Sequence, residues 1–218
     1  MLKSDNVNFE EEECLEDMNA YYEDNEDNFE NDYSNSEEEE NHFEIADILE
    51  KLPEHFYDKR KNGENDNYIC KLIQENSVID FIKHVNLYSI SLNSNIQSSI
   101  YETNSFLLKN KRTSLIEYSV FFGSKEIFVY LMQNNVDLTP SLWKYAIHGK
   151  NAEIIHILEE NGIHPDESYE EIFKESIKCH HNDIADYIVN QNLQEQNTNF
   201  TLINSLKYYN FYFMSESV

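Results

Sequence analysis

The sequence contains one dense cluster of residues with metal-binding chemistry. Cys179, His180 and His181 are consecutive, and Asp183 follows two positions later. A zinc ion requires three or four ligands that converge on one point, whereas the side chains of consecutive residues in a turn diverge. The spacing therefore predicts a structural turn and helix cap, and no metal site. A zinc or copper site is the alternative, because three more histidines lie nearby in the chain: His148, His156 and His164.

Cys179 is also a candidate nucleophile, because an adjacent histidine could serve as its base. No glycine turn that would stabilise an oxyanion accompanies it, and the sequence has neither a phosphate-binding glycine loop nor a nucleophile-elbow serine. Paired acids such as Glu159 and Glu160 are adjacent on a helix and do not face each other. We therefore expect no catalytic residue, no cofactor and no enzymatic activity. A metal-dependent hydrolase that uses the Cys-His-His turn is an alternative class.

The histidine-rich stretch belongs to a repeated unit. Residues 114–137 align without a gap with residues 141–164, at an offset of 27. A third copy, which contains the Cys-His-His turn, follows 30 residues later, and a fainter copy precedes the first. We expect four units, at residues 67–86, 113–138, 140–164 and 168–192, that stack to build one continuous core. The aligned pairs include Leu115 with Leu142, Tyr118 with Tyr145, Ser119 with Ala146, Glu126 with Glu153, Ile127 with Ile154, and Leu131 with Leu158.

Each unit is predicted to form a helix, a tight turn and a second helix. Ser114 with Glu117 has the pattern of a capping box, and Thr139 with Pro140 is typical of a helix start. Other positions that recur with the repeat are expected to allow close packing, to cap helices or to adopt left-handed backbone. These are small residues that allow close packing of the first helix (Ser119, Ala146 and Ser176), caps of the second helix (Ser124 and Asn151), and left-handed residues after it (Asn135 and Gly162).

These recurring segments resemble ankyrin repeats. Glu126 to Asp137 and Glu153 to Gly162 are similar to the second helix and exit turn of that family, and Gly123-Ser-Lys-Glu-Ile-Phe fits its Gly-x-x-Glu-Ile-Val pattern. The resemblance is closest to a divergent ankyrin-like family of uncharacterised function that is expanded in some protists, and it covers about residues 67–194. It implies an all-α, ankyrin-type helix-turn-helix solenoid of about four degenerate repeats with helical caps.

The sequence departs from the ankyrin pattern in several places. The usual Thr-Pro-Leu-His opening is missing, and Lys150 and His180 stand where the glycine that links the two helices is expected. A spacing of 27 or 30 residues, instead of 33, leaves little room for a β-hairpin finger between units. Only the segment Asn86 to Lys109 is long enough for an extended finger. We therefore expect a shorter and more helical concave surface than in a standard ankyrin array.

The resemblance implies a non-catalytic protein that binds another protein through the concave face and the finger. Nothing in the sequence identifies this partner, and we expect a monomer. Trp143 is the only tryptophan. We favour a core position for it between units, with a surface hot spot as the alternative. The candidate contact residues are Tyr101, Asn104, Phe106, Trp143, Lys144 and His148.

The first 40 residues carry most of the negative charge. They contain 17 acids and one base, Lys3, so they contribute −16 of the formal net charge of −26. We expect residues 1–40 to be a disordered arm. Phosphate binding requires clustered Lys and Arg, so nucleic acids and anionic membranes are not expected partners. The alternative function is that this arm binds basic proteins, and Ser34 and Ser36 are candidate phosphorylation sites within it.

The remaining segments are expected to cap the stack. Residues 41–66 are predicted to form an N-terminal capping helix and loop, and residues 197–218 a C-terminal cap, whose aromatic residues could instead form an exposed docking site. The N-terminus shows no leader sequence, and no apolar stretch approaches the roughly 20 residues that cross a bilayer. We therefore expect an intracellular protein, cytoplasmic or nuclear, in which three scattered cysteines form no disulfide framework.

Overall fold

The computed structural model describes residues 52–110, 112–193 and 198–214. The acidic arm with Ser34 and Ser36 lies outside these residues, as does most of the expected N-terminal capping helix. The described helices all belong to one unit, His55–Val218. These residues form helices and one isolated antiparallel bridge, Asn95 with Ser114, so the all-α prediction is confirmed for the described part. No described helix is long and apolar enough to span a bilayer.

Four successive helix pairs account for most of the described chain. They are α4 (Tyr68–Gln74) with α5 (Val78–Tyr88), α7 (Leu115–Phe121) with α8 (Lys125–Gln133), α9 (Leu142–Gly149) with α10 (Ala152–Glu160), and α11 (Tyr169–Lys178) with α12 (Asn182–Asn192). Outside these pairs lie α3 (Phe56–Arg60), α6 (Ser105–Lys109) between the first two pairs, α13 (Thr198–Lys207) and the short 3-10 helix η1 (Tyr212–Met214).

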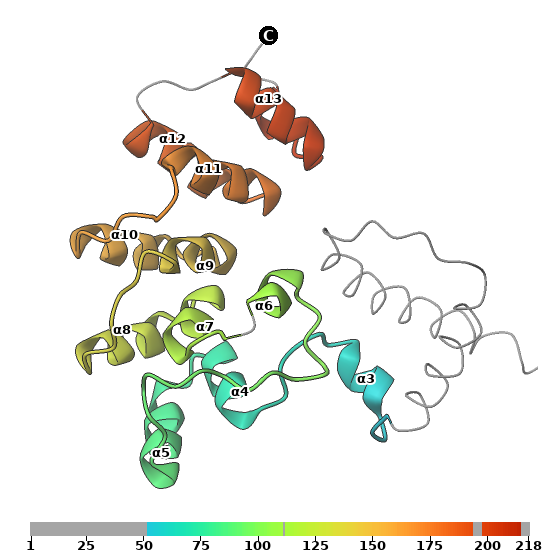
Figure 1. Ribbon diagram of the computed structural model, residues 1–218, viewed down its shortest axis with the longest axis vertical. Coiled ribbons are helices and arrows are strands. Elements are labelled where there is room, and N and C mark those ends of the chain that lie inside the picture. Colours follow the sequence, from blue (N-terminus) through green and yellow to red (C-terminus); the bar gives the residue numbers. More distant parts are fainter. Residues whose placement is uncertain (1–51, 111, 194–197, 215–218) are drawn as a thin grey trace, which may run out of the picture. The chain divides into compact units, whose positions relative to one another are not determined.

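The pairs stack through their first helices (Figure 1). Helices α4, α7, α9 and α11 pack successively on one another, and α13 continues this first-helix layer beyond α11. Each second helix packs against the first helix of its own pair. The core lies at the junctions between the pairs, where one aliphatic side chain near the end of each first helix has no exposed surface: Ile73, Val120, Ile147 and Ile177.

The turn inside each pair contains a residue with left-handed backbone conformation. These residues are Asn76, Gly123, Lys150 and His180, with φ between 49° and 64°, and Tyr209 repeats the conformation after α13. Lys150 and His180 therefore adopt the backbone that the missing glycine would adopt. The left-handed residues predicted after second helices are confirmed, because Asn135 and Gly162 have φ of 60° and 69°.

The residue that follows the left-handed position joins its pair to the preceding one. Asn151 donates to the carbonyl of Gly123 in the preceding turn, and at the other junctions the side chain donates a hydrogen bond to a carbonyl in the last turn of the preceding first helix. Such carbonyls lack some of the intrahelical donors available further inside a helix. Three junctions contain this bond: Ser124 to the Ile73 carbonyl, His181 to the Ile147 carbonyl at 2.7 Å, and Asn210 to the Ile177 carbonyl at 2.9 Å.

Gly149 lies at a close approach of α9 to α7. A Cβ atom at this position would lie 2.1 Å from the carbonyl oxygen of Val120, so no other residue fits without movement of the backbone. The small residues predicted in the first helices, Ser119, Ala146 and Ser176, are fully buried. Close packing of the first-helix layer therefore depends on small side chains, as expected.

The predicted helix caps are only partly correct. Ser114 and Glu117 form the predicted capping box, and Asn151 caps α10 by accepting from two backbone amides. Ser124 does not cap α8, because its buried hydroxyl donates to the preceding pair instead. Helix α9 starts after the Thr139-Pro140 motif, with Ser141 at its N-cap.

The segment Asn86 to Lys109 does not form an extended finger. Its first residues complete α5, its last residues form α6, and the loop between them is tied down, for example by the amide of Ile96 donating to the carbonyl of Thr113 at 2.8 Å. Phe106 of α6 packs against Phe121 and Tyr145, with ring centroids 5.9 Å and 4.9 Å apart. The expected finger is therefore folded onto the first-helix layer, because its apolar side chains gain more by burial there.

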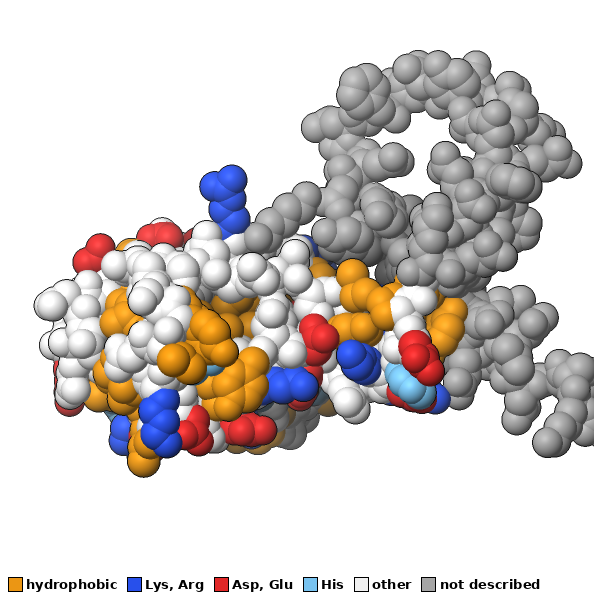
Figure 2. Space-filling view, turned by 90° about the horizontal axis from the view of Figure 1, so that it is seen from below, with side chains coloured by type: hydrophobic (Ala, Val, Ile, Leu, Met, Phe, Trp, Pro, Cys, Tyr) orange, Lys and Arg blue, Asp and Glu red, His pale blue; other side chains and the backbone are white. Residues whose placement is uncertain are grey.

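Both ends of the stack expose apolar side chains. Helix α13 packs on α11, and the ring of Phe213 contacts that of Phe173 at 5.5 Å, so the C-terminal segment covers part of the fourth pair. Its other side leaves large apolar side chains at least 54% exposed, namely Ile203, Leu206, Tyr209 and Phe211. At the opposite end the exposed side chains include Tyr68, Ile79, Leu87 and Tyr88, and Figure 2, which looks onto that end, shows apolar side chains among polar ones.

Candidate functional site

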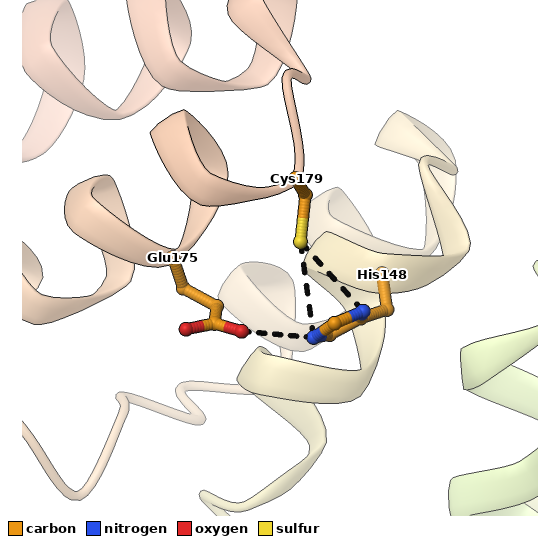
Figure 3. A group of neighbouring side chains, drawn as sticks. All are labelled: His148, Glu175 and Cys179. Carbon is orange, nitrogen blue, oxygen red and sulfur yellow. Dashed lines mark hydrogen bonds and ion pairs between the residues drawn. The ribbon is translucent and has the colours of Figure 1, made fainter. Parts of the chain in front are cut away.

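His148 lies at the junction between the third and fourth helix pairs. It belongs to the last turn of α9, and α11 directs Glu175 and Cys179 toward it (Figure 3). Nε2 of His148 is 2.9 Å from Oε1 of Glu175, and Sγ of Cys179 is 3.6 Å from Nδ1 and 3.8 Å from Nε2. These three residues, here named the His148 cluster, are half-buried.

Helix geometry and aromatic packing hold the His148 cluster together. Glu175 and Cys179 are four residues apart, so they lie one turn apart on the same side of α11. The imidazole of His148 packs against two phenyl rings, with centroids 4.1 Å from Phe106 and 5.5 Å from Phe121. Three separate segments of the chain, α6, α7 and α11, therefore restrict the orientation of one imidazole.

The two acidic groups of the cluster have strongly shifted pKa values. Burial alone would raise the pKa of Glu175, but hydrogen bonds from His148 and Lys178 outweigh it and lower that pKa to about 2. Burial, with a smaller contribution from the negative charge of Glu175, raises the pKa of the Cys179 thiol to about 12. At neutral pH the cluster therefore combines a carboxylate with a protonated thiol.

This geometry does not activate Cys179 as a nucleophile. Its sulfur is nearly equidistant from both ring nitrogens of His148, so it lies over the ring and not along the in-plane direction of either nitrogen lone pair. Proton transfer requires a hydrogen bond along that direction. A thiol with a raised pKa is also a weak nucleophile, because the thiolate is the reactive form.

The residues of the Cys-His-His turn contact different groups. Cys179 ends α11 and faces His148, whereas the ring of His180 donates to the carbonyl of Tyr208 at 3.0 Å. The ring of His181 donates to the preceding helix pair, and Asp183 is exposed in the first turn of α12. The side chains of the run therefore do not converge on one point. The predicted cap is wrong for His181, which bonds the neighbouring pair and caps no amide of its own helix.

The other histidines of this stretch do not join the cluster. His156 contacts Tyr187 at 3.4 Å on the second helices, and His164 contacts Tyr169 at 3.1 Å in the loop before α11. Among the described residues, the His148 cluster is the only group of three or more His, Cys, Asp or Glu side chains whose ligand atoms all lie within 4.8 Å of one another. Within the described part of the chain, the His148 cluster is therefore the candidate metal site.

A groove of about 400 Å³ lies beside the His148 cluster and is here named the α6–α11 groove. Side chains from α6, α7, α9, α11 and the loop before α11 line it. Glu175 belongs to both the groove and the cluster. The lining combines apolar or aromatic side chains (Phe106, Tyr145 and Ile172) with lysines (Lys109, Lys144 and Lys178) and acids (Glu117, Asp166, Glu167 and Glu175).

Ion pairs inside the groove balance much of its charge. Lys144 lies 2.7 Å from Glu167, and Lys178 lies 2.9 Å from Glu175. The Lys144 and Glu167 side chains are 39% and 43% exposed, so solvent screens their attraction and a new charged group can compete for either partner. The groove therefore presents both signs of charge beside an aromatic surface.

The structure brings some of the predicted contact residues to the groove and buries others. Phe106 and Lys144 line the groove, and His148 lies behind Phe106 in the cluster. Asn104 caps α6 by accepting from two backbone amides. Tyr101 is only 6% exposed, because the expected finger is folded back. Its prediction as a contact residue is therefore wrong.

Trp143 also requires a correction as a contact residue. Its side chain has no exposed surface, its Nε1 donates to the carbonyl of Ile163 at 2.8 Å, and its ring contacts Tyr169 edge-on. A side chain without exposed surface cannot contact a partner. The core interpretation of Trp143 is therefore correct, and the hot-spot alternative is wrong.

The sequence analysis did not identify Glu175, Tyr145 or Glu167 as site residues. One local signal for Glu175 was available, because it precedes Cys179 by one helical turn. No local signal shows that this side of α11 faces His148, since that depends on how two helix pairs pack.

Comparisons of this chain with protein-family models, with curated proteins and with solved structures find no match.

Proposed function

We propose that this chain is a non-catalytic, ankyrin-type module that binds a segment of another protein in the α6–α11 groove. The observation that carries the proposal is that one groove of about 400 Å³ is lined by three successive first helices together with α6. Grooves lined by apolar and aromatic side chains with a few polar groups are typical binding sites.

The ankyrin-type assignment rests on the repeated geometry of the helix pairs. Their tight turns use the left-handed residue that the ankyrin pattern assigns to glycine, and their first helices form one layer. The described residues contain no β-hairpin between pairs, only the isolated bridge. The connections from α8 to α9 and from α10 to α11 are short, and α6 lies in the longer connection between the first two pairs.

The lining of the groove favours a peptide with mixed chemistry. An apolar side chain of the partner would pack on Phe106 and Tyr145. A charged group beside it would replace one member of the Lys144–Glu167 ion pair. A nucleic acid is disfavoured, because four acids outnumber three lysines in the lining of the groove and the whole chain has a net charge of −26.

The non-catalytic part of the proposal is supported by the state of the His148 cluster. The thiol of Cys179 has a raised pKa and lies over the imidazole, so the most reactive side chain near the groove is not poised for attack. The partner would therefore be bound and not transformed. The chain is proposed to act as a monomer within the cell.

A matched pair of lysine variants tests the groove. Lys144 and Lys125 are each paired with a Glu of the next segment and are 39% and 40% exposed, but only Lys144 lines the groove. A partner captured with the full chain should bind at least tenfold more weakly to Lys144→Glu and with unchanged affinity to Lys125→Glu, measured by calorimetry. Equal binding by both variants would exclude the groove.

Deletion of the acidic arm separates the two binding modes. The full chain and residues 41–218 should bind the captured partner with similar affinity if the groove is the site. Loss of binding on removal of residues 1–40, with binding retained in Lys144→Glu, would assign recognition to the arm and favour a basic partner.

A further inference from the structure

We infer that His148, Glu175 and Cys179 form a binding site for one zinc ion that joins α9 to α11. The three side chains come from neighbouring helix pairs and point toward one another (Figure 3). They offer one imidazole nitrogen, one carboxylate oxygen and one sulfur, which are the three ligand types that proteins use for zinc. This site goes beyond the proposed function, since partner binding in the groove does not require it.

The spacing of the ligand atoms fits a four-coordinate ion. Bonds of about 2.3 Å to sulfur and about 2.0 Å to nitrogen and oxygen place the ligand atoms of a tetrahedral zinc site about 3.3 to 3.6 Å apart. The observed separations are 2.9 Å for nitrogen to oxygen and 3.8 Å for the same nitrogen to sulfur. One ion can therefore reach all three ligand atoms once the side chains reorient, and the fourth position is left for solvent.

The ligand set selects zinc over the abundant hard cations. Magnesium and calcium prefer sites built from oxygen ligands, and only Glu175 offers oxygen in this cluster. Thiolate and imidazole ligands favour zinc and other softer ions. Partial burial of the three side chains also reduces competition from water.

Binding changes the protons in the cluster in a defined way. The Cys179 thiol loses its proton to solvent as the sulfur–zinc bond forms. Nε2 of His148 gives up the proton that it donates to Glu175, Nδ1 takes one up from solvent, and the freed lone pair of Nε2 binds the ion. The imidazole must turn so that its nitrogen lone pair points to the ion, since the sulfur now lies over the ring. Lys178, which already donates to Oε1 of Glu175 at 2.9 Å, stays beside this carboxylate.

The test uses the full chain with zinc and an excess of magnesium. Magnesium occupies carboxylate-only sites, including any in the acid-rich first 40 residues. After desalting, native mass spectrometry should show one zinc per chain, and the apparent dissociation constant should rise at least tenfold in Cys179→Ser and in Glu175→Gln. His156→Gln is the control, because this exposed histidine lies outside the cluster and its loss should leave one zinc bound.

Two outcomes would overturn the site. One is that the wild-type chain retains no zinc, and the other is that Cys179→Ser retains as much as the wild type. Cobalt substitution of the wild-type chain provides a check that does not depend on folding of the variants. A sulfur-to-cobalt charge-transfer band is expected, and its absence would contradict ligation by Cys179.

Discussion

The ring of His181 donates a hydrogen bond to the carbonyl oxygen of Ile147 at 2.7 Å, across the junction between the third and fourth helix pairs. This carbonyl also accepts from the amide of Lys150 at 3.3 Å, so it keeps one partner when the ring is removed. We expect His181→Ala to lower the free energy of unfolding by about 1 to 2 kcal/mol in urea titrations. Asp183→Ala, an exposed change close by, should alter it by less than about 0.5 kcal/mol. Equal effects of the two variants would contradict the role of the bond.

Gly149 and Gly162 provide a matched pair of glycine substitutions. An alanine Cβ at position 149 would lie 2.1 Å from the Val120 carbonyl oxygen, whereas one at position 162 meets no atom within 4 Å. Gly162→Ala should destabilise by about 1 kcal/mol, because its φ of 69° strains any residue with a Cβ. Gly149→Ala should destabilise by about 3 kcal/mol or more, as expected for overpacking against backbone. Thermal unfolding followed by circular dichroism would rank them, and the reverse order would contradict the close approach of α9 to α7.

Trp143 is expected to stabilise the third junction. Its side chain is fully buried and hydrogen-bonded, so Trp143→Ala should lower the free energy of unfolding by about 3 to 5 kcal/mol. Lys144→Ala, at the adjacent half-exposed position, should change it by less than about 1 kcal/mol. Chemical denaturation followed by circular dichroism measures both. A stability of Trp143→Ala close to that of the wild type would show that this side chain is not part of the core.

Glu175 should make stability depend on pH in the acidic range. Its pKa is lowered from 4.5 to about 2 in the folded chain, so its contribution is complete above the unfolded value and is lost as the pH falls toward 2. The shift corresponds to roughly 3 kcal/mol at neutral pH. In the presence of a chelator, the stability difference between the wild type and Glu175→Gln should shrink by more than half from pH 7 to pH 3. A difference that does not change with pH would contradict the lowered pKa.

Lys150 offers a stabilising substitution. It holds a left-handed backbone with φ of 49°, which glycine adopts without the steric strain of a Cβ. Lys150→Gly should raise the free energy of unfolding by up to about 1 kcal/mol, with the gain reduced by the greater entropy of glycine in the unfolded chain. Asn135→Gly, at a left-handed residue after α8, should give a smaller gain, because asparagine tolerates this conformation better than lysine. Thermal denaturation of the two variants would measure the difference, and destabilisation by Lys150→Gly would contradict the strain.

The sequence by itself determined the paired helices and the positions of the turns inside each pair, but not α3 or α6. The apolar periodicity of Ile127 with Leu131, the capping box of Ser114 and the left-handed residues Asn135 and Gly162 depend on interactions within a few residues, so local pattern was enough to predict them. The buried small residues were also predictable, because they recur with the repeat. The turns and the small buried residues therefore recur from one copy of the repeat to the next.

Only the tertiary structure decided which side chains meet. The segment Asn86 to Lys109 is long enough for a finger, but burial of Phe106 against Tyr145 folds it onto the first-helix layer, and Tyr101 is buried with it. The cluster that could bind a metal is not the consecutive Cys-His-His run, since helix α11 turns Cys179 toward His148 and away from its own neighbours. Such contacts join residues 31 to 39 positions apart, and they depend on the packing of whole helices, which no local pattern records.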